Sequence, residues 1–201
     1  TDFEIRLAGI SWIDREGLNA LAIEALREHP GLLADMPLIA VDGFDSFEVL
    51  PAKKGVDAEF EQFAEGEYES SLEEVKMNLK RYGVELDEIT FVKGWYDSVL
   101  NEETRKNLAI KKAAIIYIDC DLYESAVPVL TFITPYIQDG TIIIFDDWFC
   151  FNGRPDKGEQ KAFQEWLSKN FSFVPVDFKD FGWSGKAFIL NQRSQSTGAQ
   201  H

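Results

Sequence analysis

Two stretches decide the fold of this chain: residues 113–124, AAIIYIDCDLYE, and residues 141–149, TIIIFDDWF. Each opens with a run of apolar residues and ends in a pair of acids, Asp119 with Asp121 in the first and Asp146 with Asp147 in the second. Near-continuous apolar runs are typical of parallel strands that are buried on both faces. Ligands bind beyond the carboxyl ends of such strands, so the four carboxylates predict a divalent-cation site with a catalytic base beside it.

The rest of the chain alternates apolar runs with amphipathic stretches. This pattern predicts a doubly wound α/β fold, with helices on both faces of a mostly parallel sheet. Two strand-like runs flank Gly182 and Gly185 with no helix between them, which predicts a terminal antiparallel hairpin. Further strands are expected at residues 3–10, 37–44 and 88–95, and helices at residues 18–29, 70–83, 125–140 and 158–171.

Helix signals support two of these segments. Residues 70–83 combine a serine cap, a glutamate three residues later and a terminating Gly83. Residues 125–140 are expected to form a crossover helix that tolerates Pro128 near its start and ends before Gly140.

The least regular stretches are residues 51–69 and 150–158, and both follow strand ends. We therefore expect both loops to border the same ligand face. The acidic run at residues 57–69, DAEFEQFAEGEYE, is interpreted as a solvated loop or short helix, with a substrate lid as the less favoured alternative.

Size and charge restrict the function. A chain of 201 residues suits one domain, which we place at residues 1–192 with a flexible polar tail at 193–201. The net charge of -15 argues against binding to nucleic acid or anionic membranes. No apolar run approaches the roughly 18 residues of a membrane span, so a soluble cytoplasmic protein is expected. Cys120 and Cys150 are expected to be reduced thiols, with a disulfide as the alternative.

Several segments together resemble the macrocin O-methyltransferase family, metal-dependent enzymes that use S-adenosylmethionine to methylate sugar hydroxyls on natural products. The resemblance implies a class I, Rossmann-like methyltransferase fold, with a seven-stranded sheet whose last strand is antiparallel. The matching segments span roughly residues 38 to 166 and are GFDSFEVLP at 43–51, NLKRYGV at 78–84, FVKGWYDSVL at 91–100, YIDCDLYESAVPVL at 117–130 and DGTIIIFDDWF at 139–149.

The resemblance assigns roles to the strand-end acids. It implies that Asp119, Asp146 and Asp147 bind Mg²⁺ or another divalent cation and that Asp121 is the general base. The chemistry agrees, because Mg²⁺ prefers oxygen ligands and leaves positions open for a substrate hydroxyl, while a carboxylate of ordinary pKa ~3.9 is a weak base for an unactivated alcohol.

Other positions are expected to hold the cofactor. Asp45, with Ser46 beside it, is placed to accept hydrogen bonds from ribose hydroxyls. Further cofactor-binding residues implied by the resemblance are Gly94, Trp95 and Asp97 at the adenine end, and Asp119.

The loop after the first strand departs from the family pattern. Trp12 and Arg15 stand where close backbone approach to the cofactor would favour glycine. Either Gly9 and Gly17 do this work, or the cofactor binds weakly, or this end of the protein has been rebuilt.

Alternatives stay open at this point. Any one of the four aspartates taken alone could be a turn former, whereas the pairing on two strands favours a site. Trp148, Phe149 and Phe151 could form an apolar wall for the acceptor or pack in the core. A phenolic acceptor is the second choice after a sugar hydroxyl. The rival functions are a non-catalytic binding or assembly subunit and a metal-dependent hydrolase. The sequence also leaves a homodimer open.

Overall fold

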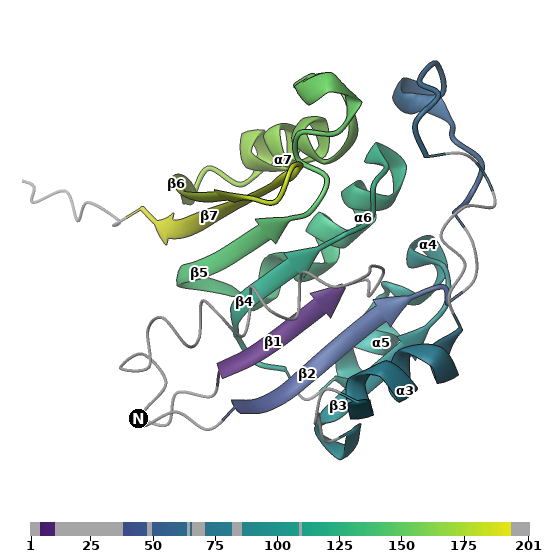
Figure 1. Ribbon diagram of the computed structural model, residues 1–201. Coiled ribbons are helices and arrows are strands. Elements are labelled where there is room, and N and C mark those ends of the chain that lie inside the picture. The colour runs from purple at the N-terminus through teal and green to yellow at the C-terminus, as the bar shows by residue number, and fades with distance from the viewer. Residues whose placement is uncertain are drawn as a thin grey trace, which may run out of the picture.

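Figure 1 shows the computed structural model of the chain, which describes residues 5–10, 38–47, 50–63, 65, 71–81, 86–108 and 110–193. Its centre is a seven-stranded sheet of order β3-β2-β1-β4-β5-β7-β6. The pairs among the first five strands are parallel, and β7 runs antiparallel to β5 and β6. The predicted α/β class is thus confirmed. The strands are β1 Ile5–Ile10, β2 Leu38–Asp45, β3 Ile89–Lys93, β4 Ala113–Ile118, β5 Ile137–Phe145, β6 Phe173–Phe181 and β7 Gly185–Gln192.

Local side chains cap the starts of two described helices, α3 and α5. Ser71 precedes the first of them and forms the predicted capping box: the Ser71 amide donates to Glu74 Oε2 at 2.9 Å, and the Glu74 amide donates to Ser71 Oγ at 3.3 Å. The predicted helix at 18–29 and the stop at Gly83 lie outside the described residues. The described helices are α3 Leu72–Arg81, α4 Tyr96–Val99, α5 Glu102–Asn107, α6 Tyr123–Ile133 and α7 Gly158–Lys169.

Helices α4 and α5 were not predicted from the sequence. The available signal was Asn101, whose side chain accepts hydrogen bonds from the amides of Glu103 and Thr104 and so caps α5. An asparagine followed by acids is a helix-start signature, because it satisfies free amides at the positive end of the helix.

The crossover helix is shorter than predicted. It ends at Ile133, and a 3-10 turn at Thr134–Tyr136 leads directly into β5. The prediction that the helix runs almost to Gly140 was therefore wrong. Ile137 already pairs with Ala113, and the extra residues are taken up by a register shift before Ile142, where Gly140 adopts a φ of 83°.

The main core lies between the sheet and the pair α6 and α7 (Figure 1). Alternate residues of three neighbouring strands face it, as the two-residue period of a strand requires. These are Ile116 and Ile118 of β4, Ile143 and Phe145 of β5, and Phe188 and Leu190 of β7, packed with Val129, Leu130 and Ile133 of α6 and Ala162, Phe163 and Trp166 of α7.

One edge of the sheet collects the candidate site. The parallel strands β2, β1, β4 and β5 all end there, at the upper right of Figure 1. The turn between β6 and β7 reaches the same edge, because Phe145 pairs with Lys186 and Phe181 with Gly185. Among the described residues, no helix is both long enough and apolar enough to cross a membrane.

Candidate active site

Three of the predicted carboxylates meet at the ends of β4 and β5. Asp119 follows β4, and Asp146 and Asp147 follow β5, its neighbour in the sheet. The Asp146 amide donates to the carbonyl of Ile118 at 2.9 Å, so the pairing of the two strands continues to the acids. One carboxylate oxygen from each aspartate lies within 4.8 Å of the others, a spacing that could hold a metal ion.

Electrostatics favours a cation at this cluster. Asp119 and Asp147 are buried, and the Oδ2 atom of each has no hydrogen-bond partner among the described residues. Burial and the neighbouring carboxylates raise the pKa of Asp119, and burial raises the pKa of Asp147. Buried, mutually repelling oxygens without donors are costly unless a cation balances them. The donor set, all oxygen, fits a hard divalent ion such as Mg²⁺.

Asp121 sits beside this group in an unusual backbone conformation. Its φ is 57°, and the Leu122 amide donates to the Cys120 carbonyl at 2.5 Å, which closes a tight turn around it. A left-handed φ is unfavourable for a residue with a side chain and is often found at functional sites. Burial and the charge of Asp147 raise the pKa of Asp121.

A fifth acid at this edge, Glu159, was not predicted from the sequence. It lies in the first turn of α7 and is fully buried. Its carboxylate accepts hydrogen bonds from the Cys120 amide at 3.4 Å and from the Asp147 amide at 3.1 Å. A glutamate in the first turn of an amphipathic helix is an ordinary surface pattern, so nothing in the local sequence marked it as buried.

The predicted cofactor residues lie on the neighbouring strands. Asp45 ends β2 and is buried; its Oδ1 accepts from the Phe47 amide at 2.6 Å and from the Ser46 hydroxyl at 3.4 Å. The Gly94 amide donates to the Asp45 carbonyl at 2.9 Å, which joins the ends of β2 and β3. The side chains of Trp95 and Asp97, in the segment after Gly94, are exposed.

Strand β1 lies between β4, which leads to the acidic cluster, and β2, which ends at Asp45. Gly9 pairs with Gly43 of β2 and with Tyr117 of β4, so it belongs to strand β1 and not to the loop that follows it. This corrects the expectation that Gly9 is part of the cofactor loop: the strand pairing extends through Ile10. Gly17, Trp12 and Arg15 lie outside the described residues.

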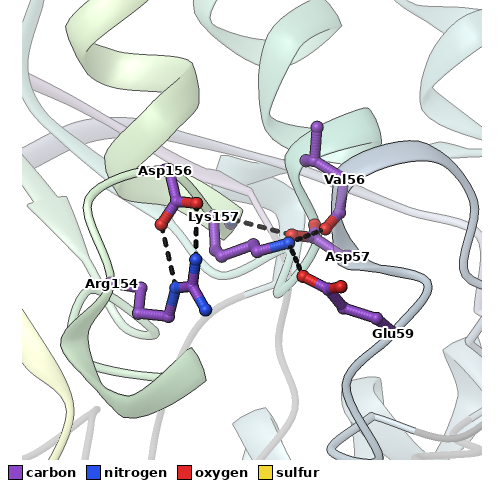
Figure 2. Close-up of polar contacts among 7 residues, drawn as sticks. Val56, Asp57, Glu59, Arg154, Asp156 and Lys157 are labelled. Carbon is purple, nitrogen blue, oxygen red and sulfur yellow. Dashed lines mark hydrogen bonds and ion pairs between the residues drawn. The ribbon is translucent and has the colours of Figure 1, made fainter.

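The two irregular loops, which were expected to border the same ligand face, also contact each other. Asp57, only 1% exposed, accepts hydrogen bonds from the first amides of two helices, Tyr123 of α6 at 2.7 Å and Gly158 of α7 at 3.0 Å. Lys157 reaches back to the Val56 carbonyl and to Glu59 (Figure 2). The interpretation of this acidic run as a solvated loop was therefore wrong for Asp57, whereas Ala58, Glu59 and Glu61 are exposed.

Phenylalanines reinforce this contact between the loops. The rings of Phe60 and Phe63 each lie 5.4 Å from the ring of Phe151, measured between centroids. Phe151 is buried in a small core with Leu122 and Cys150. Both cysteines are free and buried, as expected for reduced thiols.

Only part of the proposed aromatic wall is accessible. Trp148 and Phe151 are buried in the core, whereas Phe149 is 38% exposed. A second exposed aromatic, Trp183, lies in the turn between β6 and β7 and is 76% exposed. The two are neighbours through the backbone, since the Phe149 amide donates to the Ser184 carbonyl at 2.8 Å. Tyr123 begins α6, and its hydroxyl donates to Glu165 of α7, so this side chain links the two helices.

Curated relatives share the central part of the sequence. The chain is 32% identical over 109 residues to an 8-demethyl-8-(2,3-dimethoxy-alpha-L-rhamnosyl)-tetracenomycin-C 4'-O-methyltransferase of Streptomyces olivaceus, covering 52% of this chain and 40% of the relative. It is 28% identical over 118 residues to a mycinamicin III 3''-O-methyltransferase of Micromonospora griseorubida, covering 57% and 44%. The chain thus matches less than half the length of these relatives.

Solved structures and a family model extend the match. The structure of the O-methyltransferase NovP aligns with a TM-score of 0.63 and 22% identity, covering 94% of this chain and 72% of that one, which shows a common fold. The family model described as macrocin-O-methyltransferase, TylF, matches residues 34–169. This range contains β2 to β5 and all four strand-end aspartates. The chain belongs to the TylF macrocin-O-methyltransferase family.

Proposed function

We propose that this protein is an S-adenosylmethionine-dependent O-methyltransferase that uses a divalent cation, Mg²⁺ first, to methylate a hydroxyl group of a sugar-containing natural product. The observation that carries the proposal is the group of Asp119, Asp146 and Asp147, whose oxygens lie within 4.8 Å of one another at the ends of β4 and β5. Family membership and the sugar-modifying activities named for the relatives support the acceptor class.

In this proposal the three aspartates hold the cation. Asp119 and Asp147, whose Oδ2 atoms have no hydrogen-bond donor among the described residues, would hold it together with Asp146. Mg²⁺ usually keeps several non-protein ligands, so three carboxylates leave room for acceptor hydroxyls.

Asp121 is the proposed general base. When bound, the cation lowers the pKa of a coordinated hydroxyl and S-adenosylmethionine supplies an electrophilic sulfonium methyl group. Asp121 would accept the hydroxyl proton as the acceptor oxygen takes the methyl group, whose bond to sulfur breaks and leaves S-adenosylhomocysteine. The tight turn at Asp121 keeps the carboxylate at the cluster, so the protein contributes orientation as well as basicity.

The cofactor is proposed to lie above β1, β2 and β3. Asp45 and Ser46 would meet the ribose, and Gly94, Trp95 and Asp97 the adenine, with Asp119 facing the methyl-donor end. The Phe47 amide donates to Oδ1 of Asp45 at 2.6 Å, which orients this carboxylate at the end of β2. Gly9, near the end of β1, and Gly17 stay proposed cofactor contacts.

The acceptor is proposed to rest on Phe149 and Trp183. Both are exposed aromatics, and the backbone bond from Phe149 to Ser184 places their segments next to Asp147. Aromatic faces bind the apolar faces of sugar rings and of polyketide-type aglycones while leaving the hydroxyls free to reach the carboxylates.

Calorimetry with S-adenosylhomocysteine tests the enzyme assignment against a non-catalytic subunit. The full chain is expected to bind this product, and methyl transfer to a glycosylated acceptor is expected to need both S-adenosylmethionine and a divalent cation. Absence of binding by a well-folded sample would contradict the enzyme assignment. Turnover without the methyl donor would favour the hydrolase instead.

A further inference from the structure

Glu159 is a buried acid for which the proposed mechanism has no step. Its side chain is 0% exposed, although charged residues are seldom fully buried unless they are paired. Its hydrogen-bond donors in the described structure are two backbone amides and the Cys120 thiol. Burial and the charge of Asp147 raise the pKa of Glu159, so this position costs stability in the absence of a compensating role.

The two amides that Glu159 binds belong to the two strand ends that carry the candidate ligands. Oε1 accepts from Cys120, which lies between Asp119 and Asp121 in the chain. Oε2 accepts from Asp147 itself at 3.1 Å. The Glu159 carboxylate therefore bridges the ends of β4 and β5 through these two backbone amides. It does not belong to the group of oxygens close enough to share a metal ion, which among the described residues consists of Asp119, Asp146 and Asp147.

Hydrogen bonds to the loop after β2 also hold the start of α7, which fixes the position of Glu159. Asp57 accepts from the Gly158 amide, and Lys157 reaches the loop after β2 (Figure 2). Gly158 has a φ of 47°, and a Cβ there would lie 2.7 Å from the Phe151 ring and 3.3 Å from the Asp121 carbonyl. Only glycine fits this close approach, and the residue that follows it is Glu159.

We propose that Glu159 is a positioning residue for the cation site: its carboxylate fixes the distance between Asp119 and Asp147 by holding the backbone amides of Cys120 and Asp147. The proposal rests on the proposed function, since it assigns Glu159 a role toward the same cation. Replacing a residue that orients a metal ligand typically lowers metal affinity by roughly 10- to 100-fold.

Mn²⁺ binding to the full chain tests this role without an activity assay. Glu159→Gln keeps the size of the side chain and one acceptor oxygen but turns an NH₂ group toward one of the two amides. We expect calorimetry to show Mn²⁺ affinity about 10- to 100-fold weaker than in the wild type. Glu165→Gln, the same change farther along α7 on a part-exposed residue, is the matched control and is expected to bind Mn²⁺ normally.

Two further measurements separate positioning from folding and from charge. In a chelator, Glu159→Gln is expected to unfold at the wild-type temperature or above, because it removes a buried charge from an acidic cluster. Glu159→Asp keeps the charge but withdraws the carboxylate, and it is expected to lose Mn²⁺ affinity as Glu159→Gln does. If Glu159→Gln does not fold, Glu159→Asp carries the test.

Each outcome decides the proposal. Wild-type Mn²⁺ affinity in both variants would overturn the positioning role. Full Mn²⁺ affinity in Glu159→Asp alone would also overturn it. So would a loss of affinity that is accompanied by a lower unfolding temperature in the chelator. Wild-type protein that binds no Mn²⁺ would overturn the cation-assisted function and this role with it. If the wild type binds Mn²⁺ and the variants match it, only the positioning role fails.

Discussion

The buried acids Asp57, Asp119 and Asp147 have opposite surroundings. Asp57 has donors for both oxygens, the first amides of α6 and α7, and its loop is further tied by Lys157. Asp119 and Asp147 have oxygens without donors among the described residues, and other carboxylates surround them.

The difference separates an acid that stabilises the fold from acids that fit the proposed cation site. A carboxylate that accepts from helix amides is stabilised by the amides and by the helix dipoles, so it needs nothing more. Clustered carboxylates without donors raise the free energy of the folded state until a cation binds. The contrast predicts that replacing Asp57 lowers stability, whereas replacing a cluster acid lowers function.

The largest effect is expected from removing a cation ligand. Asp147→Asn should lower apparent Mg²⁺ affinity and methyl transfer together by more than about 100-fold, above the usual cost of losing a group that only orients a ligand. Titration of activity with Mg²⁺ measures this. Asp156→Asn, an exposed acid on the loop before α7, is the control. Unchanged Mg²⁺ dependence would remove Asp147 from the site.

Replacing the proposed base should affect turnover but not cation affinity, which would distinguish Asp121 from the three proposed cation ligands. Asp121→Asn is expected to lower turnover by roughly 100-fold or more, the usual size of a general-base contribution, with Mn²⁺ affinity largely retained. Steady-state kinetics beside calorimetry tests this. Near-normal turnover would mean that another group takes the proton.

Loss of Asp57 should reverse this pattern. Asp57→Ala leaves two buried helix amides without an acceptor and is expected to lower the free energy of unfolding by about 2–4 kcal/mol. Denaturant unfolding measures it. Asp147→Asn in a chelator should show no such loss. Glu59→Gln, which removes the charge of the exposed partner of Lys157 but keeps an acceptor oxygen, should cost less than Asp57→Ala. Equal destabilisation by Asp57→Ala and Glu59→Gln would contradict the contrast.

The smallest expected effect is a pH dependence of the cation-free protein. Acids whose pKa is raised by folding bind more protons in the folded state, so they favour folding at low pH. Their contribution is lost as the pH rises from the ordinary carboxyl pKa of about 4 through the raised values of Asp119, Asp121 and Glu159. In a chelator, the unfolding temperature should therefore fall between mildly acidic and neutral pH, and less steeply in Asp147→Asn. A rise over this range would speak against the crowding of these acids.

The sequence was informative where the signal was local. The apolar runs of β4 and β5 are continuous and each ends in acids, so their strand character and the edge to which they deliver Asp119 and Asp146 follow from a few adjacent residues. The shortened crossover helix was missed because the pairing of Ile137 with Ala113 is a contact between distant residues. The burial of Glu159 was missed for the same reason. The polar first turn of α7 predicts exposure, but Glu159 contacts the ends of both β4 and β5.

The sequence by itself determined the fold class, the family and the four aspartates of the candidate site, because strand periodicity and closely spaced acids are properties of neighbouring residues. Only the tertiary structure decided which acids have donors. Asp57 meets Tyr123 and Gly158, residues 66 and 101 positions away, and Glu159 meets Cys120, 39 positions away. Whether a carboxylate is satisfied depends on such distant partners, and burial then turns that difference into either stability or a site for a cation.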